Sequence, residues 1–235
     1  MVDDVDSQPA MVAVAHGTRS PAGRRAMAEL RLGIQALRPS LEVVPAYLDV
    51  HKPALPDVVA RLQAQHRRMV VLPLLLSTGF HLRVDVGDAV ASAGGLAAAA
   101  GPLGPDPVLA TVLDQRLTES GAESTDAIVL AAAGSSDPAA TGQIDDVAGQ
   151  LSVLRSAPVL PGYLAAAQPD VCAAVRQAGD TGRGVSIATY LLAPGHFSSR
   201  LEQACADHVA APLGPHPDIA RLALHRYDEA LARWT

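Results

Sequence analysis

The chain has 235 residues, of which 49% are hydrophobic and 18% charged, and its formal net charge is −6. A composition this apolar can bury a core, which excludes a disordered or fibrous chain, and the acidic balance disfavours a nucleic-acid partner. The acidic start, MVDDVDSQ, is unlike a signal peptide, and no apolar run approaches the ~20 residues of a membrane span. We therefore expect a cytoplasmic protein that binds neither nucleic acid nor membrane.

In the first half of the chain, short apolar runs alternate with stretches of helical periodicity. The runs are continuous and rich in Val and Leu, as expected of parallel strands buried on both faces. The predicted strands are MVAVA (11–15), LEVVPAYL (41–48), MVVLPLLL (69–76) and a short fourth run, LAAAAG (96–101). The predicted helices span residues 21–37, 54–66 and 83–93, and a last one begins at Pro107.

The second half repeats this pattern with the runs IVLAAA (128–133), APVLPGYL (157–164), VSIATYLL (185–192) and DHVAA (207–211). Four segments match in order, at offsets of 117, 116, 116 and 110 residues, aligning His16 with Ala133, Tyr47 with Tyr163, Gly79 with Gly195 and Pro105 with Pro215. The polar stretch 118–126 separates the copies. We predict an α/β protein of two similar three-layer αβα halves, each with a mainly four-stranded parallel sheet, as domains 1–120 and 121–235.

Histidines follow the strands of the first half, where a parallel sheet places its ligands. The first strand leads into His16-Gly17-Thr18-Arg19-Ser20 and the third into Ser77-Thr78-Gly79-Phe80-His81-Leu82-Arg83. Asp49 and His51 follow the second strand. Imidazole and carboxylate suit Fe, Co, Ni or Zn, and a neutral imidazole also accepts protons near pH 7. The alternatives are loop-capping or core roles for the histidines and simple exposure for His51.

The two copies differ in these residues. Ala133 stands where the first half has His16, and Ala165 and Ala167 stand where it has Asp49 and His51. The third loop keeps a histidine, His196, displaced by one position against His81. We therefore expect one active cleft, built on the first half and closed by His196, Ser198 and Ser199 of the second.

The cysteines and short motifs add exclusions. Two cysteines are too few for a disulfide framework, and Cys172 and Cys205 stand among alanines as expected small core residues. The chain has no CxxC pair or HExxH helix, which disfavours a closed structural zinc site, and no Gly-rich phosphate motif of either common type.

The segments VAVAHGTRSPAGRR, AYLDVHKPALPDVV and VVLPLLLSTGFHLRVDV closely resemble the signatures of CbiX/SirB-type sirohydrochlorin chelatases, in the class II chelatase group. The resemblance covers nearly the whole chain and implies a metal chelatase (a lyase) that inserts Fe²⁺ or Co²⁺ into sirohydrochlorin for sirohaem or cobalamin synthesis. The metal is a substrate, Ni²⁺ is a third candidate, and no permanent cofactor is implied. With both halves in one chain, we expect that a monomer can work.

The resemblance also implies roles for single residues. His16 and His81 match the histidines that bind the metal and help to remove pyrrole protons. Asp49 matches a common acidic position with a shorter side chain, and His51 is a further candidate metal ligand. Because the substrate is a polycarboxylate, the expected substrate contacts are Arg19, Arg83, Thr18, Ser20, Thr78, Gly79 and His196.

Two other functions are compatible with these loops. A carrier that binds tetrapyrrole or metal would keep the fold without turnover. A histidine phosphatase is the second, because HGTR is similar to an Arg-His-Gly phosphate loop, although Ala15 stands where that chemistry needs arginine.

Overall fold

The computed structural model describes residues 8–77 and 79–234, so the acidic start at residues 1–7 lies outside the described part. The first half consists of β1 (Ala10–Ala15), α1 (Pro21–Leu37), β2 (Val43–Tyr47), α2 (Leu55–Ala64), β3 (Met69–Pro73), α3 (Phe80–Ser92), β4 (Ala97–Ala99) and α4 (Pro107–Glu119). The second consists of β5 (Ala127–Ala132), α5 (Pro138–Arg155), β6 (Val159–Tyr163), α6 (Val171–Gly179), β7 (Val185–Tyr190), α7 (His196–Leu201), β8 (His208–Val209) and α8 (Pro217–Trp234).

Each half forms one four-stranded parallel sheet, with the orders β2-β1-β3-β4 and β6-β5-β7-β8. In the first sheet Ala15 pairs with Tyr47 and Val14 with Pro73, so the carboxyl ends of the three strands lie together. The equivalent pairs Ala132–Tyr163 and Ala131–Thr189 repeat this in the second sheet. The predicted α/β architecture of two similar halves is confirmed.

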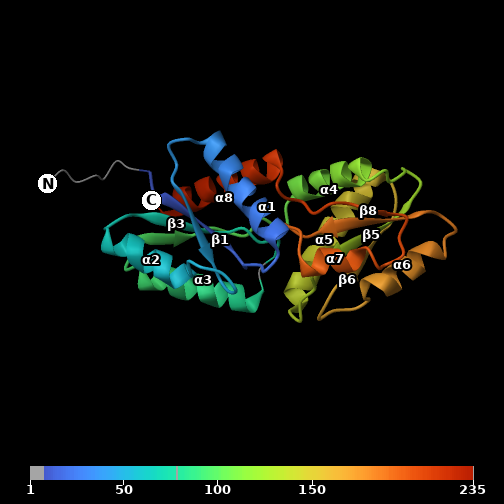
Figure 1. Ribbon diagram of the computed structural model, residues 1–235, viewed down its shortest axis with the longest axis horizontal. Helices are drawn as coiled ribbons and strands as arrows, with labels where there is room; N and C mark the ends of the chain where they lie inside the picture. Colours follow the sequence, from blue (N-terminus) through green and yellow to red (C-terminus); the bar gives the residue numbers. More distant parts are fainter. Residues whose placement is uncertain (1–7, 78, 235) are drawn as a thin grey trace.

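Helices cover both faces of each sheet and complete the three layers (Figure 1). In the first half, α2 and α3 pack on one face through Val58, Leu62 and Val86, and α1 packs on the other through Leu30 and Ile34. The helix α1 begins as predicted, because Pro21 opens its first turn and the Ser20 hydroxyl accepts a hydrogen bond from the Gly23 backbone N–H at 3.2 Å.

The two halves exchange their last helices, which Figure 1 shows as α8 beside α1 and α4 beside α5. Helix α8 packs against α1, β3 and β4, whereas α4 packs against α5 and β7. The predicted segments 1–120 and 121–235 thus each supply one sheet, and each contributes a helix to the other's outer layer. One buried apolar cluster consequently runs through both halves, from Met11 and Leu30 to Leu130 and Tyr227. Neither sheet is fully covered without the other half.

Two expectations about burial are wrong. Strand β2 is not buried on both faces: its residues alternate between buried and partly exposed, because it lies at a sheet edge, where Pro45 is tolerated without an N–H. Cys172 and Cys205 are both exposed. Cys172 lies off the face of α6 that buries Val171, Ala174 and Val175, and Cys205 follows the end of α7 with a φ of +58°.

Within the described residues, no helix combines the length and apolarity needed to cross a bilayer.

Candidate active site

The loop after β1 is held against the loop after β2. The Ala15 carbonyl accepts from the Leu48 N–H at 3.0 Å, and the His16 carbonyl accepts from the Asp49 N–H at 2.9 Å. Gly17 then turns with a φ of +103°, and a Cβ there would lie 2.0 Å from the Asp49 carbonyl oxygen. Glycine therefore fits this position both by conformation and by space. The backbone leaves His16 exposed at the carboxyl end of the buried strand.

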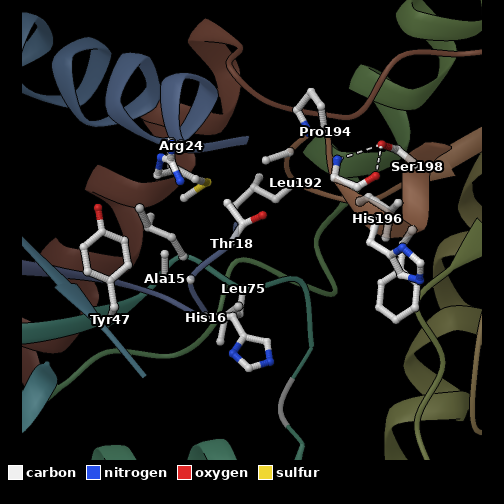
Figure 2. Close-up of a pocket in the computed structure, with 17 residues that line it drawn as sticks. Ala15, His16, Thr18, Arg24, Tyr47, Leu75, Leu192, Pro194, His196 and Ser198 are labelled. Carbon is white, nitrogen blue, oxygen red and sulfur yellow. Dashed lines mark hydrogen bonds between the residues drawn. The ribbon is translucent and has the colours of Figure 1, made fainter. Parts of the chain in front are cut away.

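A cavity of about 290 Å³ opens beside His16, between the two halves. From the first half it is lined by Ala15, His16, Gly17, Thr18, Arg24, Met27, Tyr47, Leu74 and Leu75, and from the second by residues 191–198. Figure 2 shows His16 between Tyr47 and Arg24 on one side and His196 on the other. The second half thus supplies one wall of the cavity.

A second cavity, of about 260 Å³, lies on the other side of His16. It is lined by His16, Leu75, Leu76, Ser77, Ala132, Ala133, Gly134, Ser135, Ala140, Thr141, Ile144, Tyr163, Tyr190, Leu191 and Leu192. Many of these residues are the repeat counterparts of the first cavity's lining, with Ala133 in the place of His16 and Gly134 in that of Gly17. The fold thus forms the cavity twice, and His16 lines both cavities.

The walls of both cavities lack carboxylates, although the chain carries a net charge of −6. This holds for every described residue that lines them. The described lining contains one arginine, Arg24, an exposed residue in the first turn of α1, whose Nη1 donates to the Arg19 carbonyl at 3.1 Å. Apolar side chains such as Leu75 and Leu192 make up most of the remaining surface. The site therefore suits a largely apolar ligand with anionic substituents.

Sequence reasoning missed Arg24 and considered the neighbouring Arg19 instead. A usable signal was present: Arg24 follows Ser20, the residue that caps α1, by four positions, and the Arg24 N–H donates to the Ser20 carbonyl at 3.0 Å. The first turn of a helix that follows a parallel strand lies at the ligand-binding edge of the sheet. Arg19 is exposed and is absent from the described lining of both cavities.

Three other predicted contacts lie at the cavities. Thr18 lines the first cavity, and its Oγ1 accepts from the Ser20 N–H at 3.1 Å. His196 lines the same cavity from the opposite half. Beside it, the Ser198 hydroxyl accepts a hydrogen bond from the Gly195 N–H at 2.8 Å. Ser20 and His196 both line a neighbouring cavity of about 580 Å³, to which Ser199 also contributes.

Asp49 and His51 lie beside the cavities rather than in their walls. The Asp49 carboxylate is exposed and accepts from the Val50 N–H at 2.6 Å. The ring of His51 lies edge-on to that of Tyr47, with 5.0 Å between the centroids. Tyr47 does line the first cavity, so His51 adjoins the site through that ring.

The third predicted loop lies three residues earlier than expected, because β3 ends at Pro73 instead of Leu76 and α3 begins at Phe80 instead of residue 83. Gly79 is extended, with a φ of −74° and a ψ of 159°, and precedes the helix directly, so His81 and Arg83 belong to its first turn. Thr78 and the side chains of His81 and Arg83 lie outside the described residues. In the second half His196 opens α7, so Phe197 matches His81 and the one-position displacement is confirmed.

The described side chains contain no group of three or more His, Cys, Asp or Glu arranged to hold a metal ion. Of the imidazoles, His16 and His196 line the first cavity, and His16 alone of the two also lines the second.

Comparison with known proteins identifies the family. No curated protein matches the sequence, but the CbiX family model matches residues 10–120 and 127–230, one match on each half. The structure resembles SirB from Bacillus subtilis solved with Fe³⁺, with a TM-score of 0.83, 22% identity, and coverage of 95% of this chain and 96% of that one.

Two further solved structures are similar. SirB from Bacillus subtilis subspecies spizizenii in complex with cobalt has a TM-score of 0.80 and 19% identity, with 95% of each chain covered. CbiX, described as the terminal enzyme for biosynthesis of siroheme in denitrifying bacteria, has a TM-score of 0.70 and 20% identity, with 94% of this chain and 99% of that one covered. The fold is thus that of SirB, and the family match over both halves shows that this chain belongs to the CbiX family.

Proposed function

We propose that this protein is a sirohydrochlorin chelatase that inserts Fe²⁺ or Co²⁺ into the tetrapyrrole for sirohaem or cobalamin synthesis. The observation that carries the proposal is the position of His16, an exposed imidazole between two cavities at the junction of the halves whose described lining contains no carboxylate. Family membership supports it, as do two similar structures, which are SirB with Fe³⁺ and the sirohydrochlorin chelatase SirB with cobalt.

Insertion needs a group that holds the metal briefly and accepts pyrrole protons. A neutral imidazole does both, since it binds borderline divalent metals and takes up a proton near pH 7. In this proposal His16 presents the metal to the ring nitrogens and receives a proton as the metal–nitrogen bonds form. His81 is assigned the second such role by its match to the family motif.

The substrate requires two kinds of surface. Its flat ring fits against Leu74 and Leu75 of one half and Leu191 and Leu192 of the other. Its carboxylates need cations, and Arg24 in the first turn of α1 supplies a guanidinium that can bind a carboxylate through two hydrogen bonds. Arg19, Arg83, Thr18, Ser20, Thr78, Gly79 and His196 remain proposed contacts.

The finer parts of the proposal follow from the same site. The metal is a substrate, so no resident cofactor is required, and Ni²⁺ is a third candidate metal. One chain supplies both walls of the cavity, so a monomer is sufficient. The proposed setting is the cytoplasm, and Asp49 and His51 are proposed to act on the metal from beside the cavity.

The test is an absorbance assay with purified protein. Free sirohydrochlorin is mixed with Fe²⁺, Co²⁺ or Ni²⁺ at matched free-ion concentrations, and the protein-dependent loss of the free-ligand spectrum is followed. Multiple turnovers support the proposal. Binding of one equivalent without turnover indicates a carrier, and release of phosphate from phosphomonoesters without chelation indicates a phosphatase.

A further inference from the structure

A tyrosine of the second half reaches a loop of the first. Tyr190 is the last residue of β7, is 3% exposed, and lines the second cavity. Its hydroxyl donates a hydrogen bond to the Leu76 carbonyl at 3.1 Å. Leu76 belongs to the loop between β3 and α3, and this loop leads to the helix in which His81 stands.

Among the described residues, three hydrogen bonds hold residues 74–76, and the Tyr190 bond is one of them. The Leu74 N–H donates to the Val14 carbonyl at 2.7 Å, and the Leu75 carbonyl accepts from the Leu103 N–H at 2.9 Å. Both of these come from the first half, whereas the bond to Leu76 crosses between the halves. Leu75 and Leu76 line the cavities beside His16, so their positions shape the site directly.

The repeat shows that this contact runs in one direction. In the second half the Leu192 carbonyl, which is equivalent to that of Leu76, accepts from the Gly214 backbone N–H at 3.0 Å. In the first half it is the Tyr190 hydroxyl that donates to the Leu76 carbonyl. The residue equivalent to Tyr190 in the first half is Leu74, which has no hydroxyl to donate in the reverse direction. The cross-half bond thus serves the half that carries His16 and His81.

The surroundings of the bond leave little space. A Cβ on Gly104 would lie 2.3 Å from the Leu76 oxygen and 2.5 Å from the Tyr190 hydroxyl, so the backbone at residue 104 closes over both atoms. Burial is the main cause that raises the pKa of the Tyr190 hydroxyl above its ordinary value of 10. The hydroxyl therefore stays protonated, and able to donate, throughout the physiological pH range.

We propose that Tyr190 is a positioning residue, whose hydroxyl fixes the β3–α3 loop from the second half and so sets the rate of metal insertion. The rate effect rests on the proposed chelatase function, whereas the effect on the loop does not. The second half thus has a specific task, namely to hold a loop whose residues Leu75 and Leu76 line the cavities beside His16.

The test compares Tyr190→Phe with Tyr227→Phe in the full chain. Tyr227 is 0% exposed, and its hydroxyl donates to the Pro9 carbonyl at 2.5 Å, also from the second half to the first, but before the start of β1. Each variant loses one cross-half hydrogen bond, which is small against the stability of a domain, so both are expected to fold.

Two measurements are made on each variant. For Tyr190→Phe we expect amide hydrogen exchange in residues 74–76 to rise about fivefold, and kcat for metal insertion to fall about tenfold, with KM for sirohydrochlorin within about twofold of wild type. For Tyr227→Phe we expect neither change. A purely stabilising role would instead move both variants alike.

The outcomes separate the two proposals. Unchanged exchange in residues 74–76 of Tyr190→Phe overturns the inference, as does an unchanged kcat in an active enzyme. A wild-type protein that inserts no metal overturns the chelatase proposal, while the exchange measurement still decides whether Tyr190 fixes the loop.

Discussion

The backbone at Gly17 lies so close to the Asp49 carbonyl that a Cβ on residue 17 would be 2.0 Å from its oxygen. The second half repeats this approach between Gly134 and Ala165, where the distance would be 1.8 Å. The contact was kept in the copy that lost the histidine and the acid. It therefore belongs to the fold, and it determines where His16 stands in the half that kept them.

We predict that Gly17→Ala destabilises the protein by about 1–3 kcal/mol and lowers metal insertion, because both the φ of +103° and the Asp49 carbonyl exclude a methyl group. Thermal unfolding and the insertion assay check this. The control is Gly149→Ala in α5, where a Cβ meets nothing within 4 Å. That variant should keep full activity and be as stable as wild type or slightly more so. Equal behaviour of the two variants would contradict the argument.

We predict that Arg24→Ala raises KM for sirohydrochlorin about tenfold or more with a smaller change in kcat, because Arg24 is the arginine in the described lining of the site proposed to bind this polycarboxylate. Steady-state kinetics at saturating metal check this. Arg25→Ala removes the same charge from the next residue, which is equally exposed but absent from the described lining, and should leave KM unchanged. An equal rise in both variants would show a general charge effect.

The contact of α8 with the first half should contribute to the free energy of unfolding. Arg226 of α8 pairs with Asp106 at 2.8 Å, and each side chain is 16% exposed. Because Arg226→Met leaves a mostly buried carboxylate without its partner, we expect a loss of about 3 kcal/mol in urea unfolding. Arg221→Met, on the same helix, removes a more exposed partner of Asp218 and should cost under about 1 kcal/mol. Similar losses would argue against a structural role for the Arg226 pair.

Stability should also depend on pH through His216. Its Nδ1 accepts from the Asp218 N–H at 3.2 Å at the start of α8, and burial is the main cause that lowers its pKa below the ordinary 6.5. The unfolded chain then takes up a proton more readily than the folded one. The stability contributed by neutral His216 is complete above pH 6.5 and is lost as pH falls through 6.5 toward the lowered pKa.

His216→Asn keeps a cap acceptor without a titrating group. Wild type should therefore lose stability relative to this variant between pH 7.5 and 5, as measured by urea unfolding at each pH. A constant difference across this range would refute the assignment.

The sequence predicted the parts of this structure that repeat locally. Buried parallel strands leave continuous apolar runs, and two copies of the same order identified both sheets and the end of β1 at Ala15. The end of β3 was placed three residues too late, because the apolar run continues past Pro73 to Leu76. The exchange of α4 and α8 left no such mark, because each helix has one apolar face whichever sheet it covers. The edge position of β2 was missed for a similar reason, because the sequence of a single strand does not show which strands pair with it.

The same limit applies to the site. His16 was predictable from its place after a buried strand, and the loss of its counterpart, Ala133, was visible in the repeat. Arg24 and Tyr190 were not predicted, because one lies a helical turn beyond the motif and the other acts across the junction between the halves. Their roles depend on how the two halves pack together.

The most direct test of the account is the rate of Co²⁺ or Fe²⁺ insertion into sirohydrochlorin by wild type and His16→Ala. Because His16 is assigned both metal binding and proton uptake, we predict a fall of at least about 100-fold. His66→Ala, an exposed histidine in the turn after α2, should keep the wild-type rate. A His16→Ala protein that folds and inserts metal at the wild-type rate would contradict the account.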